Sequence, residues 1–404
     1  MRPFEGRRIL LGVTGGIASY KSAWLARLLS QEGAAVDVVM TRSATEFISP
    51  ITFEALTGRP VHTALVAEGH ALDHIRLAKA AHAVVVAPAT ADFCARAAHG
   101  RADDLLAAIL LATEARVLLV PAMNDRMWAH PQTQRNAAHL REIGYDVLDP
   151  EVGALAAGEG SGAGRMPEPE TILAYVARML DDASYRGRRV VVTAGPTREI
   201  VDPVRVLSNR SSGRMGVALA AAAWRRGADV TLIAGPLEIA APVGPTLVRV
   251  ESTEEMADAV RAAAANADVL IMAAAPADFR AAAPAAAKIK KGSESPTLEL
   301  APTTDILRES ASQMRPDAIR VGFALETDNG IANARKKLES KSLDLIVLND
   351  ALEPGAGVGG ETNRVTIISR AGATEEIPLM LKREVADIIL DRVLDRVAAR
   401  TREG

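Results

Sequence analysis

The chain has 404 residues, too many for one hydrophobic core of ordinary size, so we expect two or three domains. Hydrophobic residues make up 49% and charged residues 24%, which is typical of a globular protein and excludes a disordered chain. The formal net charge of −3 provides no general attraction for nucleic acid or an anionic membrane. We therefore expect partners of neither kind.

Cysteine usage and the N-terminal residues indicate the compartment. Cys94 is the only cysteine, which excludes an internal disulfide framework and cysteine-based zinc or iron–sulfur sites. The N-terminal residues MRPFEGRRILLGV lack the pattern of a signal peptide, and no apolar run is long enough to span a bilayer. We expect a cytoplasmic protein.

The first part of the chain, residues 7 to about 150, alternates short apolar runs with amphipathic stretches. The runs predict strands at Ile9–Val13, Val36–Thr41, Ala83–Ala87 and Val117–Pro121. Helices are expected at Ser19–Gln31, Pro50–Leu56 and Asp103–Leu111. This alternation predicts a parallel sheet covered on both faces, with ligands at the carboxyl ends of the strands. The loops there are Thr14–Ile17, Thr41–Ala44, Pro88–Asp92 and Pro121–Trp128.

Residues 151–170, EVGALAAGEGSGAGRMPEPE, interrupt this alternation. Their glycine content and lack of periodicity predict a mobile loop, either a lid over a site (151–168) or a plain connection. A helix is expected at Glu170–Asp182 and a boundary at Tyr185–Gly187. The predicted domains are therefore residues 1–186 and 187–404.

The second part repeats the alternation of strands and helices. Strands are expected at Val190–Ala194, Asp229–Ala234, Asp268–Ala274, Ala318–Phe323, Leu343–Asn349 and Val365–Ser369. The last three are close together, which predicts a second parallel sheet with some antiparallel edge. Residues 288–292, KIKKG, form a basic hairpin or loop, and Lys382–Arg400 is an amphipathic structural helix.

Two stretches join a strand to a helix through a glycine-containing loop. Residues 193–216, TAGPTREIVDPVRVLSNRSSGRMG, carry four arginines before a helix, an arrangement suited to binding anions. Residues 12–21, GVTGGIASYK, lack the spacing of a dinucleotide fingerprint and the ending of a P-loop. A mononucleotide phosphate and a plain tight turn both fit the second stretch.

Two polar residues of the first part could carry chemistry. His74 begins a helix and is either a base near neutral pH or a surface or capping residue. Asn124 follows a strand and either donates to a carboxylate or caps a helix. Met123 packs in the core or against a flat cofactor.

Long motifs in this order resemble known enzymes. GVTGGIASYK, MTRSA, HIRLAKAAHAVVVAPATAD, GRADDLLAAILLAT and PAMNDRMW resemble the flavin-containing cysteine decarboxylases. TAGPTREIVDPVRVLSNRSSGRMG, AAAPADFR, KIKK, GFALET and KSLDLIVLND resemble phosphopantothenate–cysteine ligase. Together they resemble the bacterial bifunctional coenzyme A enzymes over nearly the whole chain. The resemblance implies an α/β protein with two Rossmann-like parallel-sheet domains, the first flavodoxin-like.

For residues 1–186 the resemblance implies an FMN-dependent phosphopantothenoylcysteine decarboxylase. His74 matches the catalytic histidine, and Asn124 matches the amide that binds the substrate carboxylate. The loops that contact flavin are matched by Gly15, Gly16, Thr41, Ser43, Ala89 and Thr90. The flavin carries the redox chemistry, while the protein provides orientation and proton transfer.

For residues 187–404 the resemblance implies a ligase that uses CTP and Mg²⁺. The 4′-phosphopantothenate carboxylate attacks CTP to give an acyl-cytidylate, and cysteine then displaces CMP. Asn209 matches the residue at the acyl-cytidylate, and Arg205 lies on the pantothenate side. Cations are expected from Lys288, Lys337 and Lys341. The other residues expected to hold CTP are Met272, Ala273, Ala274, Asp278, Thr303, Thr304, Asp305, Ile306 and Phe323. The family often has Asn-Pro-Asp-Ile where this chain has Thr-Thr-Asp-Ile at residues 303–306, so the asparagine of that motif is missing here, whereas Asp305 keeps its match.

The lid departs from the family. The family lid reads roughly Leu-Ala-Cys-Gly, and its cysteine protonates the enethiolate in the reductive step, whereas residues 155–161 read LAAGEGS. We hypothesise that Glu159, Ser161 or a held water substitutes, and that Cys94 is a packing residue. The alternative is a decarboxylase that stalls at the enethiol.

The same resemblance also bears on alternative functions and on the oligomeric assembly. A peptide cysteine decarboxylase is one alternative, but the attached ligase half argues against it. A flavoprotein regulatory subunit is another, and the presence of His74 and Asn124 together with a ligase half argues against that function. Family members are homo-oligomers, which implies a dodecamer of trimers linked through ligase dimers.

Overall fold

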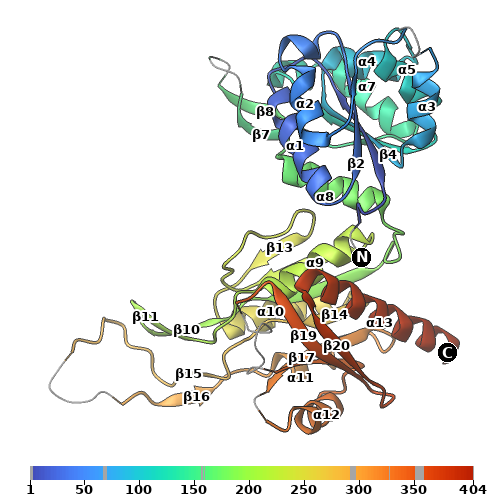
Figure 1. Cartoon of the computed structure of the whole chain (residues 1–404). Coiled ribbons are helices and arrows are strands. Elements are labelled where there is room, and N and C mark those ends of the chain that lie inside the picture. Colours follow the sequence, from blue (N-terminus) through green and yellow to red (C-terminus); the bar gives the residue numbers. More distant parts are fainter. Residues whose placement is uncertain are drawn as a thin grey trace. The chain divides into compact units, whose positions relative to one another are not determined.

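The computed structural model describes residues 3–66, 71–155, 158, 160–291, 297–326, 328–350 and 359–403. Backbone contacts divide the chain into two compact units, Met1–Asp182 and Ala183–Gly404 (Figure 1). This division precedes the boundary expected at residues 185–187. Three residues of the expected lid, Ala156, Ala157 and Glu159, lie outside the described residues.

Six parallel strands form the sheet of the first unit, in the order β3-β2-β1-β4-β5-β6. They are β1 (Arg8–Val13), β2 (Ala35–Met40), β3 (Val61–His62), β4 (Ala83–Ala89), β5 (Arg116–Pro121) and β6 (Asp146–Val147). All 7 residues of β4 are buried, because both faces of the sheet are covered, and this explains the continuous apolar runs of the sequence. Without the short edge strand β3, the order is that of flavodoxin-like folds. The predicted fold class is confirmed.

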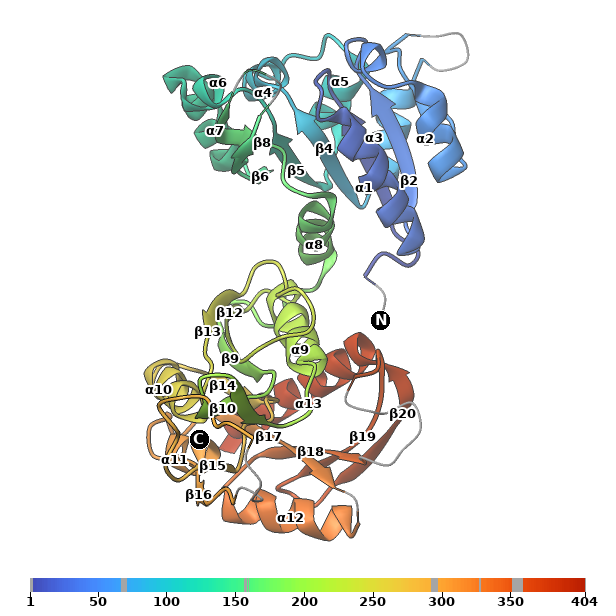
Figure 2. The ribbon, with the colours of Figure 1, turned by 90° about the vertical axis from the view of Figure 1, so that its left-hand side faces the viewer.

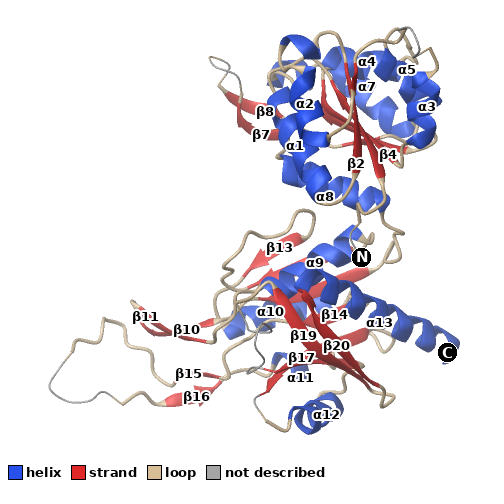
Figure 3. Ribbon diagram, in the orientation of Figure 1, coloured by secondary structure: helices blue, strands red, loops and turns tan. Residues whose placement is uncertain are grey.

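Helices cover the two faces of this sheet (Figure 3). One face carries α1 (Ser19–Gln31), α2 (Pro50–Thr57) and α8 (Pro169–Leu180). The other carries α3 (Asp73–Ala80), α4 (Ala91–Ala98), α5 (Leu105–Ala112) and α7 (Pro131–Glu142). Buried side chains such as Leu25 and Phe53 form the core of the first face, and Leu77 and Phe93 belong to that of the second. Two short segments, η1 (Ala44–Glu46) and α6 (Asp125–Ala129), follow β2 and β5.

The described part of the expected lid is an antiparallel hairpin of β7 (Glu151–Ala154) and β8 (Ser161–Arg165). The N–H group of Leu155 donates to the carbonyl of Gly160 at 2.9 Å and extends the ladder. The described residues therefore form two strands where the sequence analysis expected a loop. The strands could not be predicted from the sequence, because glycine and alanine occupy most of their positions and leave no hydrophobic alternation.

A mixed sheet of 8 strands forms the second unit, in the order β13-β12-β9-β14-β17-β18-β19-β20. The parallel strands are β9 (Arg189–Ala194), β12 (Asp229–Ala234), β13 (Thr246–Arg249), β14 (Val269–Met272), β17 (Ile319–Glu326) and β18 (Leu345–Asp350). β19 (Thr362–Ser369) and β20 (Thr374–Leu381) are antiparallel, as expected for the edge. β9 and β14 are parallel neighbours, but the strands that follow β9 are added on one side of it and those from β14 onward on the other. Ligands bind at such a switch point in folds of this kind.

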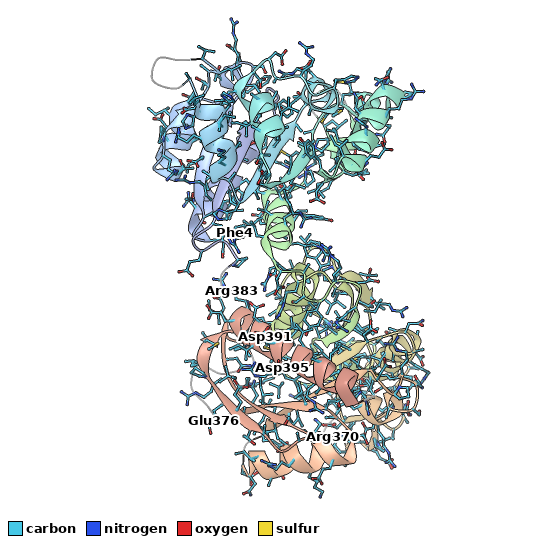
Figure 4. All side chains as sticks on the ribbon, turned by 90° about the vertical axis from the view of Figure 1, so that its right-hand side faces the viewer. Phe4, Arg370, Glu376, Arg383, Asp391 and Asp395 are labelled. Carbon is cyan, nitrogen blue, oxygen red and sulfur yellow. The ribbon has the colours of Figure 1, made fainter. Side chains whose placement is uncertain are left out.

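Among the described residues of this unit, five helices cover the sheet. α9 (Arg214–Arg225) packs with α13 (Lys382–Glu403) on one face, and α10 (Thr253–Ala264), α11 (Ile306–Ser310) and α12 (Gly330–Ser340) lie on the other (Figure 2). Asp391 of α13, labelled in Figure 4, pairs with Arg226 at 2.6 Å. The buried hydroxyl of Tyr185 donates to the carbonyl of Leu390 at 2.6 Å. These contacts fix α13 against the beginning of the unit.

The described part of the second unit also contains two antiparallel pairs of short strands: the hairpin of β10 (Arg198–Asp202) and β11 (Arg205–Ser208), and the pair of β15 (Phe279–Ala281) and β16 (Leu300–Pro302). The first interrupts residues 193–216, which were expected to form a single loop. Asp202 accepts hydrogen bonds from the N–H groups of Val204 and Arg205 at 2.8 and 2.9 Å and so forms the turn. An Asp-Pro turn between β-branched residues was the sequence signal for this hairpin.

Candidate functional site

Thr14 joins the two strands on either side of the switch point in the first unit. Its buried hydroxyl donates to the carbonyl of Pro88 at 2.8 Å and accepts from the N–H group of Thr90 at 3.1 Å. The loops after β1 and β4 are thereby held together, which is where a ligand of this fold binds. Thr14 was not among the predicted site residues, although its position directly after β1 was a signal.

Gly15 lies against the loop that follows β2. A Cβ atom on Gly15 would be 2.5 Å from the Cβ atom of Ser43, so no larger residue fits there. The hydroxyls of Thr41 and Ser43 are 3.1 Å apart. The structure therefore brings the three predicted flavin-contacting loops after β1, β2 and β4 to one edge of the sheet.

A cavity of about 470 Å³ opens at this edge. Five of the predicted residues line it: Gly15, Gly16, Thr90, Met123 and Asn124. The others in the lining are Ile17, Ala18, Tyr20, Lys21, Pro88, Ala91, Ala122, Met127, Ala154, Leu155, Gly164, Arg165 and Met166. The predicted residues Thr41, Ser43, Ala89 and His74 are not part of this lining. A mostly apolar cavity with few polar groups at a switch point fits a flat ring system.

The geometry of Asn124 is compatible with both roles considered from the sequence, which are capping a helix and donating to a carboxylate. Its Oδ1 atom accepts from the N–H group of Arg126 at 2.9 Å and caps α6. Its Nδ2 atom has no hydrogen-bond partner within the described parts of the chain, and the residue lines the cavity. The amide can therefore keep the helix cap and still donate to a carboxylate.

His74 lies in the first turn of α3, outside the cavity lining. Its Nδ1 atom is buried and lacks a hydrogen-bond partner among the described residues. Beside it, Asp73 is held by His62 at 3.2 Å and by Arg76 at 3.0 Å. A hydrogen bond from a bound ligand would stabilise this buried nitrogen, since a buried polar atom without a partner costs stability.

Cys94 is a core residue of α4. It is 3% exposed, and burial raises the pKa of its thiol to about 12. Burial of this kind suppresses the thiolate, so the packing role expected for Cys94 agrees with its surroundings.

Part of the predicted CTP site is assembled around α12. Lys341 forms an ion pair with Asp305, which also caps α11. The ammonium of Lys337 donates to the carbonyl of Phe323 at 2.8 Å. Burial lowers the pKa of Lys337, and the nearby Lys341 lowers it further. Two clustered cations with one partly desolvated fit a polyphosphate.

A second group of predicted residues surrounds the end of β14. The N–H group of Ala274 donates to the hydroxyl of Thr193 at 3.1 Å. Asn209 donates to the carbonyl of Pro276 at 2.9 Å. Thr303 donates its backbone N–H to the carbonyl of Asp278 at 3.0 Å. The remaining predicted residues of this region are Met272 and Ile306, which are buried, and Ala273 and Thr304, which are half-buried.

Arg205 is tied to the basic segment. It pairs with Asp202 and donates to the carbonyl of Ile289 at 3.0 Å, while the N–H group of Ile289 donates to Asp202 at 3.1 Å. Lys288 therefore directly precedes Ile289, which is hydrogen-bonded to the β10–β11 hairpin, and the side chain of Lys288 is exposed. Asp202, which sequence reasoning did not single out, organises this junction.

The described residues contain neither a metal-binding cluster nor a helix that could span a membrane. No group of three or more His, Cys, Asp or Glu side chains there could hold a metal ion. Within the same residues, none of the helices has both the length and the apolar character needed to cross a membrane.

Comparisons with known proteins agree with both units. Residues 2–181 match the Flavoprotein family model, and residues 185–397 match that of the DNA/pantothenate metabolism flavoprotein C-terminal domain. The coenzyme A biosynthesis bifunctional protein CoaBC of Mycobacterium tuberculosis (strain ATCC 25618 / H37Rv) is 46% identical over 409 residues, which cover 97% of this chain and 97% of that protein. The chain belongs to the CoaBC family. Membership confirms the resemblance seen in the motifs and the prediction of a bifunctional enzyme with a flavoprotein unit.

Other CoaBC proteins are similar over the same length. The one from Bacillus subtilis (strain 168) is 44% identical over 395 residues, 96% of this chain and 97% of that protein. A crystal structure of the C-terminal domain of a CoaBC protein is 38% identical with a TM-score of 0.45, and the match covers 52% of this chain and 96% of that one.

Proposed function

We propose that this chain catalyses two consecutive steps of coenzyme A biosynthesis. The second unit joins 4′-phosphopantothenate to cysteine with CTP, and the first unit converts the product to 4′-phosphopantetheine with FMN. The observation that carries the proposal is the cavity at the switch point of the first unit, lined by Gly15, Gly16 and Asn124, in a chain that is similar to CoaBC proteins over 97% of its length.

In the ligation, the 4′-phosphopantothenate carboxylate attacks the α-phosphorus of CTP and releases pyrophosphate. The amine of cysteine then displaces CMP from the acyl-cytidylate and forms the amide. Lys337, Lys341 and Lys288 would offset the charge of the triphosphate. Mg²⁺ would be held chiefly by the phosphates, since the described residues lack a cluster of metal ligands. Asn209 would contact the acyl-cytidylate, and Arg205 would use N–H groups left free by Asp202 for the pantothenate side.

In the decarboxylation, FMN would supply the acceptance and return of a hydride when bound. Asn124 would donate its Nδ2–H to the carboxylate of the cysteine moiety and orient it for loss as carbon dioxide. His74, whose buried Nδ1 atom lacks a partner among the residues that the structure describes, would accept a proton during the oxidation of the cysteine moiety. Gly15 and Gly16 would allow the backbone to approach the cofactor closely.

The second candidate function is a decarboxylase that stalls at the enethiol. The observation that favours it is the lid sequence LAAGEGS, which lacks the thiol of the family. Ser161 begins β8, has an exposed side chain and is not part of the cavity lining. Glu159 lies outside the described residues, and a held water is the third proposed donor.

Two assays test the proposal. Sustained release of pyrophosphate from CTP over many turnovers should require both 4′-phosphopantothenate and cysteine, whereas up to one equivalent per site, released as the acyl-cytidylate forms, requires 4′-phosphopantothenate alone. Mass spectrometry of the final product should then show 4′-phosphopantetheine. Accumulation of a species two hydrogen atoms lighter would support the stalled enzyme. Pyrophosphate release without 4′-phosphopantothenate, or sustained release without cysteine, would refute the ligase.

A further inference from the structure

Lys21 is a buried lysine in the lining of the cavity. Its side chain is 8% exposed, and its ammonium donates to the carbonyl of Met166 at 2.9 Å and to Glu168 at 3.1 Å. Burial of an ammonium is costly unless it is paired and hydrogen-bonded. Because of this cost, Lys21 and the segment that it contacts must keep their relative positions.

That segment is the foot of the hairpin. Met166 and Glu168 connect β8 to α8, and Glu168 also pairs with Arg165, the last residue of β8. Burial alone would raise the pKa of Glu168, but Lys21 and Arg165 outweigh burial and lower its pKa. Glu168 is therefore an ionised anchor between α1 and the hairpin.

The hairpin in turn touches the segment that carries Asn124. The N–H group of Met123 donates to the carbonyl of Gly164 at 3.0 Å. A Cβ atom on Gly164 would be 2.1 Å from the carbonyl oxygen of Met123, and one on Gly162 would be 2.5 Å from the Cβ atom of Asp125. Such close packing transmits a shift of β8 to the residues on both sides of Asn124.

We propose that Lys21 and Glu168 are positioning residues of the decarboxylase site. They hold the foot of the hairpin to α1 and, through β8, set the backbone that presents Asn124 to the substrate carboxylate. The inference rests on the decarboxylase function proposed above. We refer to this pair as the Lys21–Glu168 clamp.

The test compares Lys21→Met and Glu168→Gln with Glu170→Gln in the full chain. Glu170, in the first turn of α8, accepts a hydrogen bond from Trp24 of α1 at 2.9 Å, away from the cavity lining, and is the matched control. We expect the first two variants to accelerate hydrogen exchange of the Met123 amide by about tenfold. We expect the KM for 4′-phosphopantothenoylcysteine to increase by about tenfold with FMN still bound, because a small misplacement of a binding group has a large effect. Glu170→Gln should change neither.

Unchanged exchange at Met123 together with an unchanged KM in Lys21→Met and Glu168→Gln would overturn the clamp. If Lys21→Met fails to fold, Glu168→Gln decides, since it leaves the Met166 contact of Lys21 in place. Absence of decarboxylation in the wild-type chain would contradict the proposed function alone. The exchange rates would then still decide whether the clamp fixes the hairpin.

Discussion

Gly164 and Met123 meet backbone to backbone, with a hydrogen bond of 3.0 Å and no space for a Cβ atom on the glycine. We expect Gly164→Ala to displace β8 and to destabilise the docked hairpin by about 1–3 kcal/mol. Decarboxylation should fall steeply, while CTP-dependent ligation in the second unit should be retained. Gly153→Ala is the control, because the three atoms nearest to its Cβ atom would all belong to the flexible side chain of Arg165, the closest at 3.0 Å. Equal decarboxylase rates for the two variants would contradict a role for this contact.

The ion pair of Lys341 with Asp305 gives a second prediction. Lys341→Ala should raise the KM for CTP in the pyrophosphate-release assay by about tenfold or more, since a charge-assisted contact to a phosphate would be lost. Lys336→Ala removes an exposed lysine from α12, which Lys341 directly follows, and should leave the KM within about twofold. A KM for CTP that responds equally to both substitutions would exclude a specific contact.

Asp202 predicts a dependence on pH at the junction of the hairpin with the basic segment. Burial acts to raise its pKa, but the N–H groups of Val204, Ile289 and Arg205 and the Arg205 side chain outweigh burial and lower it to about 2. The unfolded value is about 3.9, so ionised Asp202 stabilises the junction above that pH, and the contribution disappears as the pH falls towards 2.

Asp202→Asn should therefore reduce the hydrogen-exchange protection of the Ile289 amide at pH 5 by about tenfold. The difference from wild type should shrink as the pH falls from about 4 to about 2. The exposed Asp229 provides the control variant, Asp229→Asn. A difference that stays constant over this range would show that the charge of Asp202 is not responsible.

Cys94 gives a direct chemical test of its surroundings, because it is the only thiol in the chain. With a pKa of about 12, its thiolate fraction at pH 8 is about one in ten thousand. We expect no reaction with a thiol reagent such as Ellman's reagent over minutes in the folded protein, and one equivalent after unfolding in urea. Cys94→Ala should leave the ratio of enethiol to 4′-phosphopantetheine unchanged. A shift of that ratio towards the enethiol would make Cys94 the missing proton donor.

The hydrophobic pattern of the sequence was sufficient for most of the architecture. Buried parallel strands must be apolar on both faces, so runs such as Ile9–Val13 and Val190–Ala194 identify the two sheets. The spacing of apolar residues predicted α1 at the bounds that the structure has, Ser19–Gln31. Carboxyl ends of adjacent parallel strands must meet at one edge, which is why the loops containing Gly15 and Asn124 could be assigned to one site.

Only the tertiary structure decided how these loops are held. The hydrogen bonds of Thr14 with Pro88 and Thr90, the burial of Lys21 against Glu168 and the contact of Gly164 with Met123 join residues that are far apart in the chain. No local pattern marks them, because a threonine, a lysine or a glycine has the same local propensity whether or not a distant partner faces it. The sequence determined which chemical groups reach the carboxyl edge, and long-range packing determined which of them are free to meet a ligand.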